Sequence, residues 1–156
     1  MASECVIEVK DLVKKFGDFT ANDHLTFSVY RGEIFGFLGA NGAGKTTTLR
    51  ILSGLSKPTA GKITIAGFDV YRETEKIKKC IGYMSQKFSL YEDLTVVENM
   101  RLYGGIYSMS TKRINARIKE IIQKLHLEKQ KNSLISSLPL GIKQKLGFSV
   151  AIFHLP

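Results

Sequence analysis

A glycine-rich segment at residues 39–46 constrains the fold of this chain more than any other feature. The segment reads Gly-Ala-Asn-Gly-Ala-Gly-Lys-Thr and satisfies the pattern G-x-x-x-x-G-K-[ST] at every position. An apolar run of strand type, residues 33–38, precedes it, and residues 46–54 follow with apolar side chains at helical spacing and a closing glycine. Strand, glycine loop and helix in this order favour a phosphate-binding loop over a glycine-rich turn with an exposed lysine. The order predicts an α/β domain built around a phosphate site.

This loop supplies the donors that a nucleoside triphosphate needs. Its glycines let the backbone wrap the phosphates, so that successive N–H groups and the helix N-terminus face the anion. Lys45 adds a positive charge for the β- and γ-phosphates, and the Thr46 hydroxyl is placed to ligate Mg²⁺. The predicted binding residues are Gly39, Ala40, Asn41, Gly42, Ala43, Gly44, Lys45, Thr46 and Thr47.

Composition adds a few limits to this interpretation. The net charge is +9, but the 23 Lys and Arg residues are spread along the 156-residue chain. This spread favours solvated faces and attraction to anionic ligands or lipid headgroups over a nucleic-acid interface. Cys5 and Cys80 form no metal-binding pattern, and we expect both to stay reduced. No signal peptide and no apolar stretch long enough to span a bilayer is present, so work at a membrane would require a partner.

Alternating side chains predict an antiparallel sheet in the first part of the chain. Residues 5–9 and 25–29 alternate apolar and polar side chains, as half-buried strands do. Residues 62–65 follow a glycine and precede another, which predicts a third short strand. Residues 74–79 favour a brief helix, and residues 81–84 favour a buried strand.

The pattern becomes helical from Thr95 to about His126. One helix face there is apolar, which favours core packing over a ligand site; its residues are Ile114, Ile118, Ile121, Ile122 and Leu125. Residues 136–139 then predict a helix start, with serine in capping range and proline in the first turn.

The order of these features resembles the ATP-binding subunits of ABC transporters. The phosphate loop follows an antiparallel segment, residues 81–86 resemble the family's Q-loop, and residues 90–99 resemble the beginning of its helical subdomain. The resemblance covers the whole chain and is strongest from Gly32 to Thr48. It implies an α/β P-loop NTPase of ABC type, with an antiparallel β subdomain and a helical subdomain.

This resemblance also implies a division of the chain. The nucleotide-binding core with the β subdomain, phosphate loop and Q-loop would span 1–94, and the helical subdomain 95–136. Residues 137–156 would hold the family's signature motif and its helix.

Further site residues follow from the resemblance. Gln86 would reach the Mg²⁺ and the γ-phosphate of ATP and report on the transmembrane partner, so Lys45 and Gln86 are the candidate catalytic residues. Thr46 and Gln86 are the candidate Mg²⁺ ligands. Residues 14–18 resemble the A-loop, which would place Phe16 against the adenine; by residue type alone Phe16 is equally a core residue at the end of a strand.

The agreement is poorest at the signature motif, usually Leu-Ser-Gly-Gly-Gln. Here residues 138–142 read Leu-Pro-Leu-Gly-Ile. In the family this segment caps the γ-phosphate held by a second subunit, and Pro139 offers neither a hydroxyl nor an N–H for that role. Loss of the serine bond would weaken that composite site by about tenfold or more. A motif of this kind resembles ATP-binding proteins of the ABC-2 export type.

A second departure lies at the end of the sequence. The family's Walker B aspartate, the neighbouring glutamate and the switch histidine would follow Pro156, so the resemblance implies that the C-terminal third is missing. Such a sequence is a shortened protein or gene fragment, or a partner supplies the remainder. We expect this chain to bind nucleotide better than it hydrolyses it, and to be unstable, self-associated or completed by another polypeptide.

The resemblance implies a function for the parent protein. It would be the ATP-binding subunit of an ABC transporter, coupling ATP binding and hydrolysis to export at the cytoplasmic face of the cell membrane. Its partners would be a transmembrane permease subunit and a second ATP-binding subunit, with no nucleic acid. Two alternatives stay open: a soluble ABC-type ATPase acting on ribosomes or chromosomes, and a nucleotide-binding regulatory module without turnover.

Overall fold

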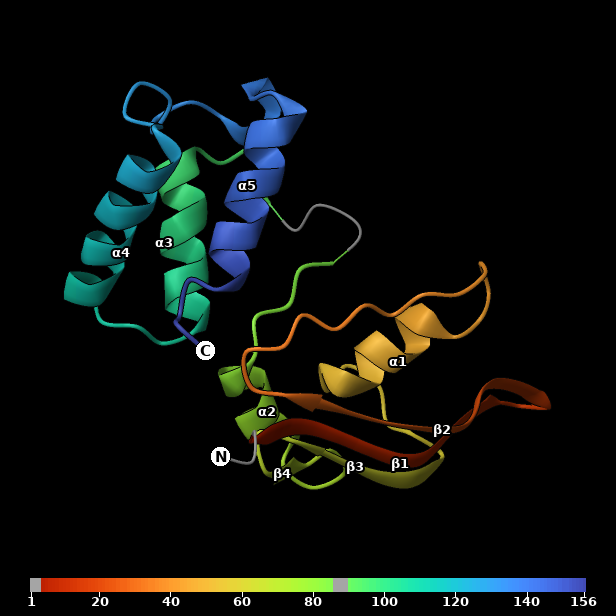
Figure 1. Cartoon of the computed structure of the whole chain (residues 1–156). Helices are drawn as coiled ribbons and strands as arrows, with labels where there is room; N and C mark the ends of the chain where they lie inside the picture. Colours follow the sequence, from red (N-terminus) through yellow and green to blue (C-terminus); the bar gives the residue numbers. More distant parts are fainter. Residues whose placement is uncertain (1–3, 86–89) are drawn as a thin grey trace. The chain divides into compact units, whose positions relative to one another are not determined.

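The chain folds into two compact units. The computed structural model describes residues 4–85 and 90–156 (Figure 1). The units are Met1–Ile81 and Gly82–Pro156. The motifs imply a different division, at residues 94 and 136, which follows functional segments of the chain. That division stays a prediction.

An antiparallel sheet forms the base of the first unit. Its strands are β1 (Cys5–Phe16), β2 (Phe19–Tyr30), β3 (Ala60–Ile65) and β4 (Phe68–Asp69), in the spatial order β2-β1-β3-β4. All three pairings are antiparallel. The three predicted strands are therefore confirmed, and the first two extend well beyond the alternating runs that predicted them.

Two helices pack on this sheet. They are α1 (Lys45–Leu52) and α2 (Thr74–Cys80), and each contributes one fully buried isoleucine, Ile51 and Ile77. These side chains join one apolar cluster with residues of the sheet and of the following turn, namely Val9, Leu12, Ile63, Ile65 and Val70. The helix that carries the end of the glycine loop is thus fixed to the sheet by burial of its apolar face.

The strand predicted at residues 33–38 does not form. Residues 33–40 are irregular (Figure 1). Ile34 and Leu38 are 99% and 94% exposed. A strand requires a neighbour that accepts and donates its backbone hydrogen bonds, and within residues 4–85 and 90–156 no strand pairs with this segment. Phe35 and Phe37 instead pack against Phe27 of β2, with ring centroids 5.3 and 5.4 Å from it.

The buried strand predicted at residues 81–84 is also wrong. This segment is irregular, and Tyr83 and Met84 are exposed. An apolar run of four residues does not determine a strand by itself when no ladder of hydrogen bonds forms beside it.

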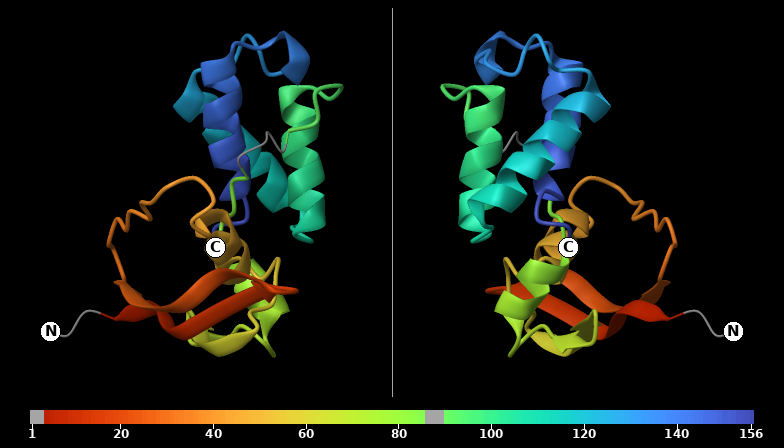
Figure 2. Two further views of the ribbon diagram at one scale, coloured as in Figure 1. Left: turned by 90° about the vertical axis from the view of Figure 1, so that its right-hand side faces the viewer. Right: turned by 90° about the vertical axis from the view of Figure 1, so that its left-hand side faces the viewer.

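The second unit is a small helical bundle. It contains α3 (Val96–Ile106), α4 (Thr111–Leu125), a 3₁₀ turn (Ile135–Ser137) and α5 (Leu140–Ala151), and both views of Figure 2 show the three α-helices side by side. The helical pattern predicted for residues 95–126 is therefore confirmed as two helices. Thr95 begins α3 with a capping box, in which its hydroxyl accepts from the Glu98 N–H and the Glu98 carboxylate accepts from the Thr95 N–H.

The predicted apolar face of residues 114–125 is confirmed as core. Four isoleucines of α4 are buried, and Leu125 packs against them partly exposed. The remaining fully buried side chains of this cluster come from α3, from α5 and from the segments outside the α-helices: Val96, Met100, Leu127, Ile135, Leu146, Val150 and Phe153. Among the helices of the described residues, none is long and apolar enough to cross a membrane.

Serine does not cap α5 as the sequence predicted. Pro139 is the N-cap residue, and no side chain makes a capping hydrogen bond there. The Ser137 hydroxyl donates backward to the Leu134 carbonyl oxygen over 2.8 Å, within the 3₁₀ turn. Ser136 and Ser137 both belong to this 3₁₀ turn, which ends at Ser137. Neither serine is therefore at the N-cap position of α5.

Candidate functional site

Two glycines of the loop have the left-handed backbone from which anion-binding loops are built. Gly42 and Gly44 have φ angles of 85° and 79°, in the left-handed region that glycine adopts without strain. Gly44 is the N-cap of α1, and its carbonyl oxygen accepts the Thr48 N–H over 2.9 Å. The N–H groups of the next three residues, 45–47, have no carbonyl within the helix to pair with. They stand at the positive end of the helix dipole, where negative charge is stabilised.

Lys45 places its charge on this loop. Its ammonium group donates to the carbonyl oxygens of Gly39 and Ala40, over 2.7 and 2.6 Å. The side chain therefore folds back across the loop that precedes it, bringing a full positive charge to the segment with the left-handed glycines. A phosphate oxygen is a stronger acceptor for an ammonium group than a backbone carbonyl, so an arriving phosphate group can take over these contacts.

Gly44 lies in close contact with β2. A Cβ at this position would overlap the Ala21 carbonyl oxygen and the Asn22 side-chain nitrogen. Asn22 is 3% exposed, and its amide donates to the Gly44 carbonyl oxygen over 3.3 Å and to the Thr48 hydroxyl over 2.9 Å. Strand β2 thus positions the junction between the loop and α1.

The sequence pattern does not identify Asn22. The alternation of Leu25, Phe27 and Val29 places odd-numbered residues of β2 toward the core, which would turn residue 22 outward. His24 has a φ of 47°, and the pairing of β1 with β2 shifts register in this stretch. This irregularity of β2 turns the Asn22 side chain inward. A single sequence contains no pattern that predicts such a register shift.

The predicted Mg²⁺ ligand and adenine platform are both accessible. Thr46 is exposed in the first turn of α1. Phe16 ends β1 and is 54% exposed, and the Lys14 ammonium lies 4.7 Å from its ring centroid. Phe16 therefore lies outside the buried cluster of its unit, which does not fit the alternative of a strand-end core residue. A hydroxyl oxygen is a suitable Mg²⁺ ligand where phosphates and water complete the octahedron.

Two further predicted elements belong to the second unit or lie outside the described residues. Gln86 is among residues 86–89, which the structure does not describe. In the signature segment, Leu138 is buried, whereas Leu140 is 59% exposed in the first turn of α5. Lys143, one turn further, forms an ion pair with Glu92 over 3.1 Å.

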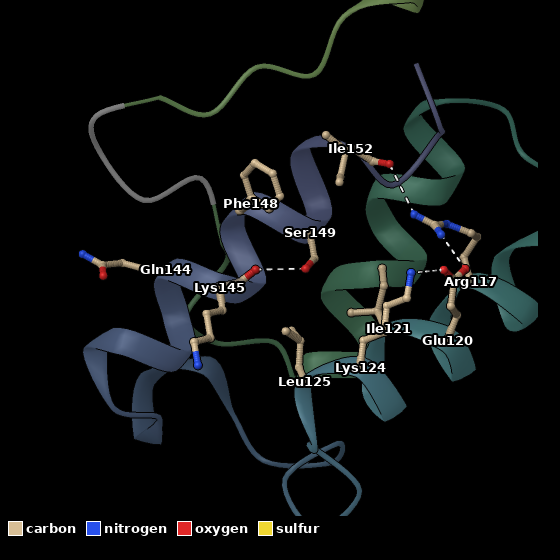
Figure 3. A pocket seen from close by; sticks show the side chains of 10 residues that line it. All are labelled: Arg117, Glu120, Ile121, Lys124, Leu125, Gln144, Lys145, Phe148, Ser149 and Ile152. Atoms are coloured by element: carbon tan, nitrogen blue, oxygen red, sulfur yellow. Dashed lines mark hydrogen bonds and ion pairs between the residues drawn. The ribbon is translucent and has the colours of Figure 1, made fainter. Parts of the chain in front are cut away.

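A hollow on the helical unit is separate from all of these residues. It lies between α4 and α5 and has a volume of about 540 Å³. Phe148, Ile121 and Leu125 are among the side chains that line it (Figure 3). Arg117 and Lys124 at its margin are both bound to Glu120. None of the residues that the sequence assigns to nucleotide binding lines it.

Comparisons with known proteins agree with this geometry. The family model described as ABC transporter matches residues 22–156. The chain is 44% identical, over 153 residues, to the "Probable multidrug ABC transporter ATP-binding protein" of Escherichia coli; this covers 98% of the chain and 26% of that protein. It is 39% identical, over 151 residues, to the "Bacitracin transport ATP-binding protein" of Bacillus licheniformis, covering 97% of the chain and 48% of that protein.

Solved structures give the same result. An "ATP binding subunit of ABC transporter" superimposes with a TM-score of 0.83 at 32% identity, covering 97% of this chain and 63% of that chain. A dimeric ATP-binding cassette in a post-hydrolysis state, bound to ADP and Pi, superimposes with a TM-score of 0.81 at 28% identity; it covers 96% of this chain and 70% of that one. The chain spans about a quarter to a half of the curated relatives named above. Its matched residues 22–156 include the glycine loop and α5, and on this basis the chain belongs to the ABC transporter family.

Proposed function

We propose that this chain binds Mg-ATP, with the phosphates held by residues 39–47. The observation that carries the proposal is the loop itself: left-handed glycines at the N-terminus of α1, with the Lys45 ammonium bound to the loop backbone. Lys45 neutralises the β- and γ-phosphates, and Thr46 supplies a hydroxyl ligand to Mg²⁺, an ion that holds the phosphates and offsets their charge when bound. Phe16 offers an exposed ring to the adenine.

In the parent protein, ATP binding and hydrolysis drive export through a transmembrane permease. The names of the relatives support this step, because they are ATP-binding proteins of multidrug and bacitracin transport. The dimeric state of the solved ATP-binding cassette supports a second ATP-binding subunit as partner. The protein would then be peripheral to the cytoplasmic face of the membrane. Gln86 would contact the Mg²⁺ and γ-phosphate, and with Lys45 it completes the proposed catalytic pair.

Titration of a fluorescent ATP analogue tests the nucleotide site. We expect saturable, Mg²⁺-dependent binding to the 156-residue chain, and loss of that binding in Lys45→Ala, because the variant removes the charge that faces the phosphates. Lys57→Ala is the matched control, since it removes an exposed lysine from the same unit. Equal affinity of Lys45→Ala and Lys57→Ala would refute the assignment.

A further inference from the structure

The least expected feature of the first unit is a buried asparagine that is only half satisfied. Asn22 is 3% exposed, and its amide nitrogen makes two hydrogen bonds while its amide oxygen makes none. The orientation of the amide is determined by its neighbours, because the Gly44 carbonyl oxygen can only accept and so must face the nitrogen. A buried acceptor without a donor costs roughly as much as a lost hydrogen bond. An apolar side chain of the same size would avoid this cost.

The two bonds that Asn22 makes converge on one peptide group. The Gly44 carbonyl oxygen accepts the Thr48 N–H, the Thr48 hydroxyl over 3.1 Å, and the Asn22 amide over 3.3 Å. Asn22 also donates to the Thr48 hydroxyl oxygen over 2.9 Å, which holds that hydroxyl in place. Three donors on one carbonyl exceed what an ordinary N-cap carbonyl receives from the helix alone.

The same peptide group carries the N–H of Lys45. Hydrogen bonds accepted by a carbonyl polarise its peptide and strengthen the N–H at the other end. The Lys45 N–H is one of the unpaired donors at the N-terminus of α1, which on the proposed function face the phosphates. The Asn22–Thr48–Gly44 contacts therefore act on a phosphate donor, although none of these side chains needs to touch the nucleotide.

We propose that Asn22 is a positioning residue for phosphate binding, which fixes and polarises the Gly44–Lys45 peptide through its own amide and through Thr48. This inference rests on the proposed nucleotide site. It gives a reason for a costly buried amide at this position, since rules of local stability are expected to fail at functional sites. It also predicts that replacing Asn22 lowers the affinity for nucleotide without lowering the stability of the fold. Both quantities can be measured.

Asn22→Leu tests the inference. We expect affinity for the fluorescent ATP analogue to fall about three- to tenfold, as for the loss of one hydrogen-bonding group. The urea midpoint should stay equal or rise, because leucine removes the unsatisfied oxygen, while the Gly44 carbonyl keeps its two donors from Thr48. In competition experiments, the affinity for Mg-pyrophosphate should fall by the same factor, because Asn22 acts on phosphate binding and not on binding of the adenine base.

Thr48 supplies the conservative rescue. Thr48→Val should weaken binding because it removes the hydroxyl between Asn22 and Gly44, whereas Thr48→Ser should bind as the wild type does. The double variant Asn22→Leu/Thr48→Val should lose less affinity than the two single losses combined, because the residues act through one peptide group.

A buried asparagine elsewhere gives the control. Asn99 of α3 is fully buried and donates to the carbonyl oxygens of Tyr91, Leu94 and Thr95. Asn99→Ala should lower the unfolding midpoint and leave the affinity of the folded protein unchanged. Unchanged affinity in Asn22→Leu, or a loss that only follows its folded fraction, would overturn the inference. Binding by the wild type and its loss in Lys45→Ala would still support the nucleotide site in that case.

Discussion

Two helices of this chain begin in opposite ways. At α1 the N-cap is Gly44 in the left-handed region, preceded by a loop of small residues with a lysine folded across it. At α5 the N-cap is Pro139, followed by Leu140, which is 59% exposed. Both helix termini present unpaired N–H groups and the positive end of a dipole. Only the first is preceded by left-handed glycines and by a lysine side chain bound to the loop backbone.

We infer that a helix N-terminus alone does not make a phosphate site. What distinguishes α1 is the loop that precedes it and the strand that supports it, through the contacts of Ala21 and Asn22 with Gly44. At α5 the preceding serines are used in a 3₁₀ turn, and the Ser137 hydroxyl points back to the Leu134 carbonyl. We therefore expect phosphate at α1 and not at α5 in the isolated chain.

The largest effect should come from Gly44→Ala. The substitution forces a left-handed φ on alanine and places a methyl group against the Ala21 carbonyl. We expect a loss of about 2–6 kcal/mol of stability in the first unit, from strain and overpacking together, and no detectable ATP binding. Urea unfolding and nucleotide titration measure both quantities.

Gly42→Ala is the matched control for this substitution. Gly42 also has a left-handed φ, but an added Cβ would meet nothing within 4 Å. It should cost only about 1–2 kcal/mol, the strain of a non-glycine residue in this region. Equal losses in the two variants would mean that contact with β2 does not define the loop.

A smaller effect is expected at the base of the nucleotide. Phe16→Ala should weaken ATP binding by about 1–2 kcal/mol and leave pyrophosphate binding unchanged, because only the aromatic contact is removed. Phe16→Tyr should be tolerated. Phe19, which pairs with Phe16 across the hairpin and is also exposed, gives the control Phe19→Ala. If Phe16→Ala binds ATP as tightly as Phe19→Ala does, the adenine lies elsewhere.

The smallest effect is expected at the second helix terminus. Pro139→Ser introduces a hydroxyl that can accept from the unpaired N–H groups of α5, and it should raise the stability of the helical unit by about 1 kcal/mol. Pro139→Ala lacks the hydroxyl and is the control. No difference between the serine and alanine variants in thermal unfolding would show that this terminus is already satisfied.

The sequence predicted those parts of the molecule that local patterns determine. Two alternating runs and one run between glycines predicted three strands of the sheet. The apolar face of residues 114–125 predicted the buried side of α4, and the glycine pattern predicted the loop at the N-terminus of α1. These features depend on near neighbours in the chain, because strand alternation, helical spacing and loop curvature are all local.

Other features depended on distant neighbours, and local patterns predicted them wrongly or did not identify them. Residues 33–38 have strand composition, but a strand needs a partner, and Ile34 and Leu38 are left exposed. Asn22 faces inward only because the register of β2 shifts near His24. The Ser137 hydroxyl could have accepted a hydrogen bond from an N–H group of α5 or donated one to a carbonyl oxygen before it. In the 3₁₀ turn it donates to the Leu134 carbonyl oxygen. Pairing, register and competition between hydrogen bonds are tertiary effects that a single sequence does not determine.

The most direct test of the account is the response of backbone amides to Mg-ATP. In an NMR titration of the 156-residue chain, the amides of residues 42–47 should shift most, because their N–H groups would bind the phosphates. The amides of Leu140, Gly141 and Ile142 at the start of α5 should stay close to their positions in the free protein. Shifts concentrated at residues 140–142, or none at residues 42–47, would contradict the assignment of phosphate binding to α1.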